Sequence, residues 1–340
     1  MRGVAPFLVF AVVASVASGC GTCEPSSLTA DAATEAVAHA DPSPFPAGRP
    51  RTSSLPAHIP LSCRIATVTG TVTAAPLWQA DGATKGTADA GPLTAGEVPS
   101  EGWLDLAASA HMVARDPVST RETSFLGPAR VRACVEHDGT SQPGRGPHED
   151  EESWVLRGIF ESAPGSGERP GGEEWVVTPM GVVRYDAAGL RVTASAGLTE
   201  ARVDTGSAFV WPAADAAVKL DAGVEEGWLR VNNGATTTLR PAKAQSPAAA
   251  ASKAASSCKA AADRAKDLAE EIAAPDASLG DLAPRHINAR KVARAACAVA
   301  LLRAQVLPGG PSRDDAMQIA RAADAEWRSQ TEAARPALEP

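Results

Sequence analysis

The sequence predicts an α+β protein whose two kinds of secondary structure are segregated along the chain: an antiparallel β region followed by an alanine-rich antiparallel helical bundle. Through the middle of the chain, apolar residues alternate in short runs that glycine and proline separate. Near Pro241 the composition changes abruptly, and beyond it apolar residues recur at helical spacing. The 29 glycines and 27 prolines exclude a mostly helical chain.

Chain length and charge narrow the classes of function. The 340 residues, 44% of them hydrophobic, are enough for two ordinary domains and their tethers. The formal net charge is −8, and the sequence contains no dense cluster of lysine and arginine residues. Electrostatic attraction to a phosphate backbone is therefore weak, and we expect no nucleic-acid partner.

The N-terminus predicts export. Arg2 precedes an apolar run, Val4 to Ala17, that is too short for a permanent membrane span, so residues 1–19 are expected to be a signal peptide. The segment Ala17 to Cys20 (ASGC) resembles the lipobox of bacterial lipoproteins. This resemblance implies that Cys20 carries a lipid such as palmitate and anchors the chain at the outer membrane, facing the periplasm or the cell surface. Ordinary signal-peptidase cleavage is the alternative, because two residues of this segment are small.

Residues 20–60 are predicted to be a disordered tether. They are rich in proline, serine, alanine and threonine and lack a sustained apolar period, so they cannot bury enough surface to offset the entropy of ordering. A flexible segment of about 35 residues reaches on the order of 35 Å. Cys20 and Cys23 form a C-x-x-C pattern without a βαβ context, and no redox role is expected for it.

The β region is expected over residues 61–240. Its richest part, Glu174 to Trp211, reads as several short strands with tight turns, which is typical of a β-meander in an all-antiparallel module. Earlier strands are expected where apolar residues alternate. They are Ser62 to Trp78 (a strand pair), Trp103 to Leu106, Ala110 to Val113, Phe125 to Cys134 and Trp154 to Phe160. Ala163 to Glu173 is expected to be a loop.

This order of patterns resembles the extracytoplasmic domain of the FecR family, over Ile65 to Val231. The matching residues are Leu93, Gly96, Glu97, Val98, Leu104, Leu106, Val177, Thr178, Pro179, Gly181, Val182, Ala188, Gly189, Leu190, Val192, Val203, Gly206 and Phe209. FecR proteins relay a signal to a sigma factor through a cytoplasmic segment and one membrane span. Here only a cleavable signal precedes the β region, so the resemblance implies a binding or scaffolding module in the cell envelope rather than direct control of a sigma factor.

Three helices are predicted over residues 246–335. The first, Ser246 to Ala273, carries apolar residues at alternating spacings of three and four, and Pro275 to Gly280 ends it. The second runs from about Leu282 to Val306, and the third begins with Ser312 as its N-cap. The apolar stripes are suited to antiparallel, coiled-coil-like packing or to contact with another subunit or peptidoglycan.

The cysteines suggest disulfides in an oxidising compartment. Cys258 and Cys297 lie at similar distances on either side of the break between the first two helices, so folding these helices back on each other brings the thiols to the same height. Cys63 and Cys134 are candidates for a second disulfide, and this pairing leaves Cys23 without a partner cysteine. Other pairings remain open.

No catalytic constellation is recognisable, and we expect no catalytic residues, no metal and no cofactor. One acidic, glycine-rich loop holds residues that could surround a divalent cation, but their spacing matches no ligand pattern and a solvated hairpin tip is the favoured interpretation. These residues are His137, Asp138, His148, Glu149 and Asp150. The other histidines stand alone and are expected to be structural or exposed to solvent; they are His39, His58, His111 and His286.

Two functions are compared. The first is a non-catalytic lipoprotein that is held at the lipid bilayer and binds an envelope protein or peptidoglycan. The alternative is an envelope hydrolase acting on peptidoglycan or glycan, which requires paired carboxylates in a cleft. Trp78, Trp154 and Trp228 would anchor a partner if exposed, although burial in the core is the favoured interpretation, and an exposed Trp327 would favour oligomerisation.

Overall fold

The structure is a computed structural model, and it describes residues 64–75, 92, 96–97, 103–115, 122–135, 150–164, 173–186, 188–219, 223–225, 227–274 and 277–338. These residues belong to one compact unit, His58–Pro340. The predicted signal peptide and tether lie outside the described residues, as do Cys20, Cys23, Cys63 and the possible cation ligands from His137 to Glu149.

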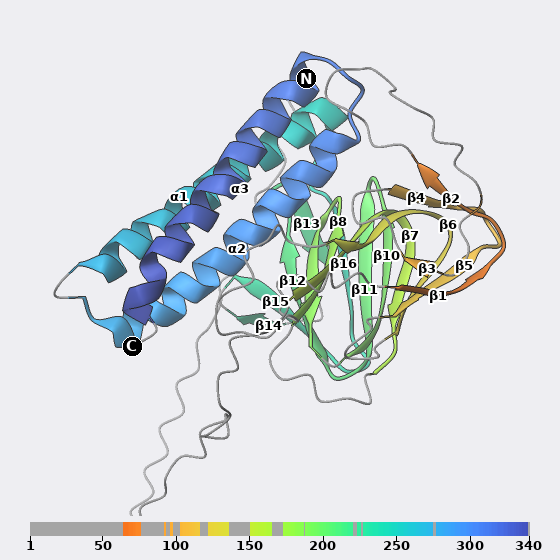
Figure 1. The fold of residues 1–340 in the computed structure, drawn as a ribbon, viewed down its shortest axis with the longest axis horizontal. Coiled ribbons are helices and arrows are strands. Elements are labelled where there is room, and N and C mark those ends of the chain that lie inside the picture. Colours follow the sequence, from red (N-terminus) through yellow and green to blue (C-terminus); the bar gives the residue numbers. More distant parts are fainter. Residues whose placement is uncertain are drawn as a thin grey trace, which may run out of the picture. The chain divides into compact units, whose positions relative to one another are not determined.

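The described residues form sixteen strands followed by three helices, so the predicted segregated α+β class is confirmed (Figure 1). The strands are β1 (Arg64–Thr69), β2 (Val72–Ala75), β3 (Gly96–Glu97), β4 (Trp103–Leu106), β5 (His111–Arg115), β6 (Glu122–Val135), β7 (Asp150–Ser162), β8 (Glu173–Thr178), β9 (Gly181–Tyr185), β10 (Gly189–Ser195), β11 (Leu198–Thr205), β12 (Ser207–Pro212), β13 (Ala216–Lys219), β14 (Gly223–Glu225), β15 (Trp228–Asn232) and β16 (Thr236–Pro241). The helices are α1 (Pro247–Ala273), α2 (Leu279–Gln305) and α3 (Pro311–Leu338).

All strands belong to one sheet, and its longest path runs β13-β16-β11-β10-β7-β8-β9-β12-β15-β14. The expectation of an all-antiparallel module is wrong at one place, because β7 and β8 are parallel, with Asp150 opposite Glu173 and Trp154 opposite Val177. The long strand β7 uses its second half to pair with β10 and its first half to pair with β8. The range expected to be a loop, Ala163 to Glu173, is one residue too long, because β8 begins at Glu173.

The sheet buries side chains on both of its faces. Because successive side chains of a strand point to opposite faces, Val176 belongs to the core inside the curled sheet while its neighbours Trp175 and Val177 belong to a second core beneath the helices. Phe125 and Phe160 meet edge to face in the inner core, with ring centroids 5.5 Å apart. The three helices pack on one another as the predicted antiparallel bundle, and α2 lies against the outer face of the sheet (Figure 1).

The helix starts follow local sequence signals. Ser246 caps α1, and its hydroxyl accepts a hydrogen bond from the backbone N–H of Ala249 at 3.2 Å. Helix α3 begins at Pro311, so Ser312 lies inside the first turn and its predicted role as N-cap is wrong. Proline is well suited to the first helical position, because its fixed φ matches the helix and its missing N–H would be unpaired there.

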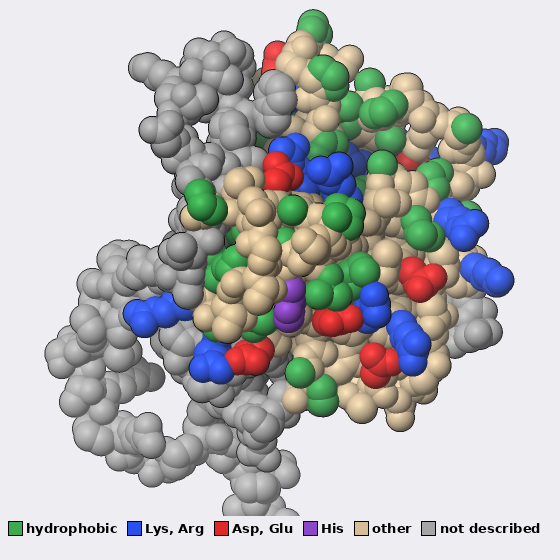
Figure 2. All heavy atoms as spheres, turned by 90° about the vertical axis from the view of Figure 1, so that its right-hand side faces the viewer, with side chains coloured by type: hydrophobic (Ala, Val, Ile, Leu, Met, Phe, Trp, Pro, Cys, Tyr) green, Lys and Arg blue, Asp and Glu red, His purple; other side chains and the backbone are tan. Residues whose placement is uncertain are grey.

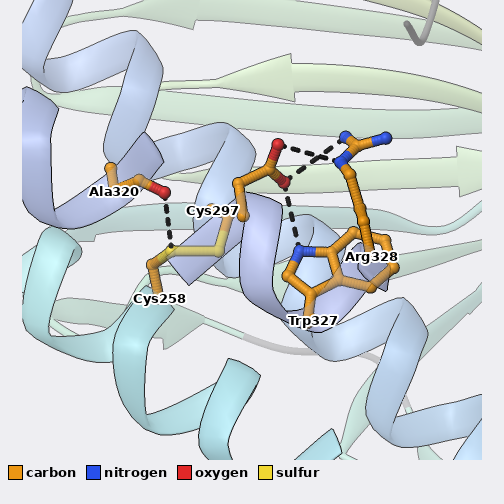
Figure 3. The surroundings of a disulfide bond; sticks show 6 residues. Cys258, Cys297, Ala320, Trp327 and Arg328 are labelled. Atoms are coloured by element: carbon orange, nitrogen blue, oxygen red, sulfur yellow. Dashed lines mark hydrogen bonds and ion pairs between the residues drawn. A yellow bond between two sulfur atoms is a disulfide. The ribbon is translucent and has the colours of Figure 1, made fainter. Parts of the chain in front are cut away.

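A disulfide joins α1 to α2. Cys258 and Cys297, the pair expected from the helix spacing, are bonded and fully buried, with Cα atoms 4.5 Å apart (Figure 3). Helix α3 closes over them, and its Ala320 carbonyl oxygen lies 3.7 Å from the Cys258 sulfur. The side chain of Cys134 is not described and Cys63 lies outside the described residues, so the second disulfide stays a prediction.

Trp327 of α3 is buried against the helical side of the outer core, so the exposed tryptophan that would favour oligomerisation is not present. Its indole N–H donates to Asp324 at 3.1 Å, and the Arg328 guanidinium lies 5.1 Å from its ring centroid (Figure 3). Among the described residues, no helix has both the length and the apolar character that a membrane span requires.

Candidate functional site

The junction between α2 and the outer face of the sheet is built from tryptophan rings and cations. The Arg184 guanidinium of β9 lies between two aromatic rings, 4.4 Å from the centroid of Phe209 and 4.6 Å from that of Trp228. It forms an ion pair with Glu173 at 2.6 Å, and Lys291 of α2 reaches the same carboxylate at 2.7 Å. Glu173 therefore links the sheet to α2.

A second, deeper contact involves Arg294 of α2. Its guanidinium lies 4.2 Å from the centroid of Trp175, and its Nη2 is 3.4 Å from Oε2 of Glu152. The other oxygen of Glu152 accepts the indole N–H of Trp154 at 2.8 Å. Glu152 is 1% exposed, so its charge depends on these donors for stabilisation.

Arg303 ties three parts of the fold together near the end of α2. Its Nε donates to the Pro179 carbonyl oxygen in the β8–β9 turn at 2.7 Å, and its Nη1 donates to the Ala250 carbonyl oxygen of α1 at 3.1 Å. The same Nη1 forms a buried ion pair with Asp215 at 2.9 Å. The amide of Gln245 also donates to Asp215, so both ions are held by hydrogen bonds as well as by their mutual attraction.

The buried carboxylates hold the fold together and do not form a catalytic pair. Glu152 is bonded to an indole and a guanidinium, Asp215 to a guanidinium and an amide, and Glu174 to the hydroxyl of Tyr185. Within the described ranges, no group of three or more histidine, cysteine or acidic side chains could hold a metal ion. The arrangement is that of structural ion pairs rather than of general acid–base chemistry.

His286 of α2 is fully buried, and its two ring nitrogens make no hydrogen bond to any residue that the structure describes. Burial, together with the charge of Arg290, lowers its pKa to about 4. The ring is therefore neutral near neutral pH and serves as a packing group. His111 lies half-buried on β5, while His39 and His58 lie outside the described residues.

A groove of about 240 Å³ lies between α1 and α2. It is lined by Ala261, Arg264, Arg285, Asn288, Ala289 and Val292. Asn288 joins the groove to the sheet, because its side-chain oxygen accepts the Trp228 indole N–H at 3.2 Å. This lining offers two cations and an amide above small apolar groups, and it contains no nucleophile, carboxylate or imidazole.

The face of the sheet that carries β1 to β6 is mixed in charge. Figure 2 shows acidic and basic side chains interspersed there, with hydrophobic groups between them. Arg130 and Asp105, on neighbouring strands, are an example of such a pair at 2.7 Å. The described residues of this face therefore offer a phosphate backbone no continuous basic surface.

The structure places Trp154 and Trp228 in the outer core, in agreement with their favoured interpretation as core residues, whereas Trp78 lies outside the described residues. Sequence reasoning missed the cations that lock the helices to the sheet, Arg184, Arg294 and Arg303. One signal was available: consecutive apolar residues, as in Trp175 to Val177, are typical of strands that are buried on both faces.

No family model matches the chain, and no curated protein matches it. Two solved crystal structures share a limited similarity, and both are described as a putative anti-sigma factor from Parabacteroides distasonis ATCC 8503. They are 13% and 12% identical over 42% of this chain, each with a TM-score of 0.30. The alignments span 57% and 56% of those two chains, which is little more than half of their length.

Proposed function

We propose that this chain is a non-catalytic binding or scaffolding protein of the cell envelope that acts by surface contact. The observation that carries the proposal is the composition of the α1–α2 groove, whose arginines, asparagine and small apolar residues can bind a ligand but cannot activate water or a nucleophile. The buried carboxylates support the same conclusion, because each is bonded to structural donors.

The proposal includes a FecR-like region over residues 61–240 and a helical region over residues 246–335. Strands fall at the positions where the sequence resemblance places them, among them β4, β6 and β8 to β12. Residues 1–19 direct export, and a lipid on Cys20 holds the protein at the outer membrane. Radiolabelled palmitate should enter the wild-type protein and not a Cys20→Ser variant; equal labelling of both would contradict the anchor.

The binding role is tested in the intact chain, because removing the helices would uncover the tryptophans of the outer face. A photo-crosslinking amino acid is placed in turn at exposed positions of α1, α3 and β11, and cells are irradiated. A saturable adduct with one envelope protein, or with peptidoglycan, is expected at a subset of positions. Uniformly weak adducts at every position would count against a binding role.

No described feature favours the hydrolase alternative, but it can be tested directly. Purified peptidoglycan and glycan substrates are incubated with the full-length protein, and soluble products are measured against a known hydrolase. No release above buffer is expected. Release that disappears on substitution of a single carboxylate would overturn the non-catalytic proposal.

A further inference from the structure

We propose that the groove between α1 and α2 binds a carboxylate side chain presented by an acidic peptide segment of a protein partner. This inference rests on the proposed binding role and deepens it, because it names the surface and the chemistry of the partner. Arg264 and Arg285 supply the charge, and Ala261, Ala289 and Val292 supply the apolar wall.

The two arginines are available for a ligand. Arg264 projects from α1 and Arg285 from α2, so the groove has a cation on each helix. Both side chains are exposed, and neither forms a hydrogen bond or an ion pair with a residue that the structure describes. A guanidinium offers a planar pair of donors that matches the two oxygens of a carboxylate.

Exposed arginines without an ion pair to another described residue are not rare, and Arg157, Arg240 and Arg321 are further examples. The groove is distinguished because two such cations, one from each helix, line the same hollow. In a chain of net charge −8, carboxylates are plentiful, yet neither arginine of the groove is paired with one in the described structure. The pair therefore offers unused positive charge at a hollow in the surface.

The size of the groove fits one side chain better than a cofactor. Its volume of about 240 Å³ equals the liquid volume of roughly eight water molecules and falls below the range of ~300–1,000 Å³ that small-molecule pockets occupy. The small apolar wall can contact the methylene groups of a glutamate while the guanidinium groups hold its oxygens. A carboxylate on a short aliphatic stem is therefore the best match.

The charge of the two helices favours an anionic ligand. α1 and α2 together carry nine lysines and arginines and five aspartates and glutamates, so the local charge is positive although the chain as a whole is acidic. The preference for a carboxylate over a phosphate therefore rests on the apolar wall of the groove, which can contact an aliphatic stem.

The bond between Trp228 and Asn288 provides a local reporter. Asn288 lines the groove, and the Trp228 indole N–H donates to its side-chain oxygen. A ligand in the groove should therefore change the NMR signal of this indole in full-length protein labelled with ¹⁵N at its tryptophans. The probe is an alanine peptide with blocked ends and two glutamates, and the comparison peptide has glutamines in their place.

The glutamate peptide is expected to shift the Trp228 signal saturably, with an affinity that falls as salt is added, and the glutamine peptide is expected to have no effect. Arg264→Gln and Arg285→Gln should each weaken binding about tenfold. Arg321→Gln, which removes the same charge from an exposed position of α3 outside the groove, should leave the affinity unchanged.

Equal binding of the two peptides would overturn the inference, as would an equal loss of affinity in Arg321→Gln. Inorganic phosphate is titrated in parallel, and tighter binding of phosphate than of the glutamate peptide would show a phosphate site instead. If the groove fails these tests while photo-crosslinking at other surfaces still captures an envelope partner, the proposed function stands and only the location of its binding surface is wrong.

Discussion

Replacing Arg303 by methionine should loosen the helices from the sheet. The substitution keeps an unbranched apolar stem but removes the guanidinium that bonds Asp215, Pro179 and Ala250. Arg303 and Asp215 are 6% and 5% exposed in their side chains, so the aspartate would keep a buried charge without this cation. Breaking a buried pair in this way typically costs about 3–5 kcal/mol. We expect Arg303→Met to lower the free energy of unfolding by that amount at neutral pH.

A double-mutant cycle separates the ion pair from simple loss of packing. Asp215→Asn removes the buried charge yet keeps an oxygen for Gln245, so the double variant should be about 1–2 kcal/mol more stable than Arg303→Met alone. The matched control is the exposed pair of Arg202 and Asp204, where the same substitutions should cost less than about 1 kcal/mol. Urea unfolding followed by tryptophan fluorescence measures all variants. A cost below about 1 kcal/mol for Arg303→Met, or no recovery in the double variant, would refute the reasoning.

Three further predictions concern the same unit. Replacing Cys258 and Cys297 together by alanine should cost about 4 kcal/mol, because the disulfide closes a loop with a sequence separation of 39; calorimetry that finds less than about 1 kcal/mol would contradict this. The free energy of unfolding should fall as the pH drops from about 6.5 towards 4, because the pKa of His286 is lowered to about 4 in the folded protein and the unfolded chain therefore binds a proton first. His286→Leu should reduce this pH dependence of stability. An unchanged pH dependence in the variant would assign it to other groups. Gly181→Ala should destabilise the folded protein by about 1–3 kcal/mol, because a Cβ at this position would lie 2.3 Å from a backbone oxygen. Gly197→Ala is the control, since a Cβ there meets nothing within 4 Å, and thermal unfolding should show almost no change in its stability.

Much of the fold could be predicted from local sequence signals. Alternation located the strands at Trp103 to Leu106 and at Phe125 to Cys134, and the helical period located α1. The disulfide followed from helix geometry, because Cys258 and Cys297 are spaced evenly about one break in the chain. In each case the deciding interactions lie close together in the sequence or follow from a simple hairpin.

Other features depend on long-range pairing and could not be read in this way. Alternating side chains do not reveal strand direction, so the parallel pairing of β7 with β8 was missed. The attachment of the helices rests on contacts such as that of Lys291 with Glu173, which are 118 residues apart. In the sequence, Arg294 and Arg303 resemble residues on the polar face of an exposed helix. No neighbouring residue indicates that the tryptophan-bearing outer face of the sheet packs against this helix.

The α1–α2 groove was missed for a related reason. Its lining comes from two helices, and neither helix alone distinguishes Arg264 or Arg285 from an ordinary solvated arginine. Only the packing of α1 against α2 brings the two cations to one hollow. Composition predicted that nucleic acid is not a partner, but it could not locate this small site.

The helices and the sheet share the outer core, so we predict that they unfold as one unit. Unfolding of the full-length protein in urea, followed at once by helical circular dichroism and by tryptophan fluorescence, tests this most directly. We predict that the two curves coincide at a single midpoint, because Trp175 and Trp228 are buried beneath α2. Loss of the helical signal at a clearly lower urea concentration than the fluorescence change would contradict a shared core.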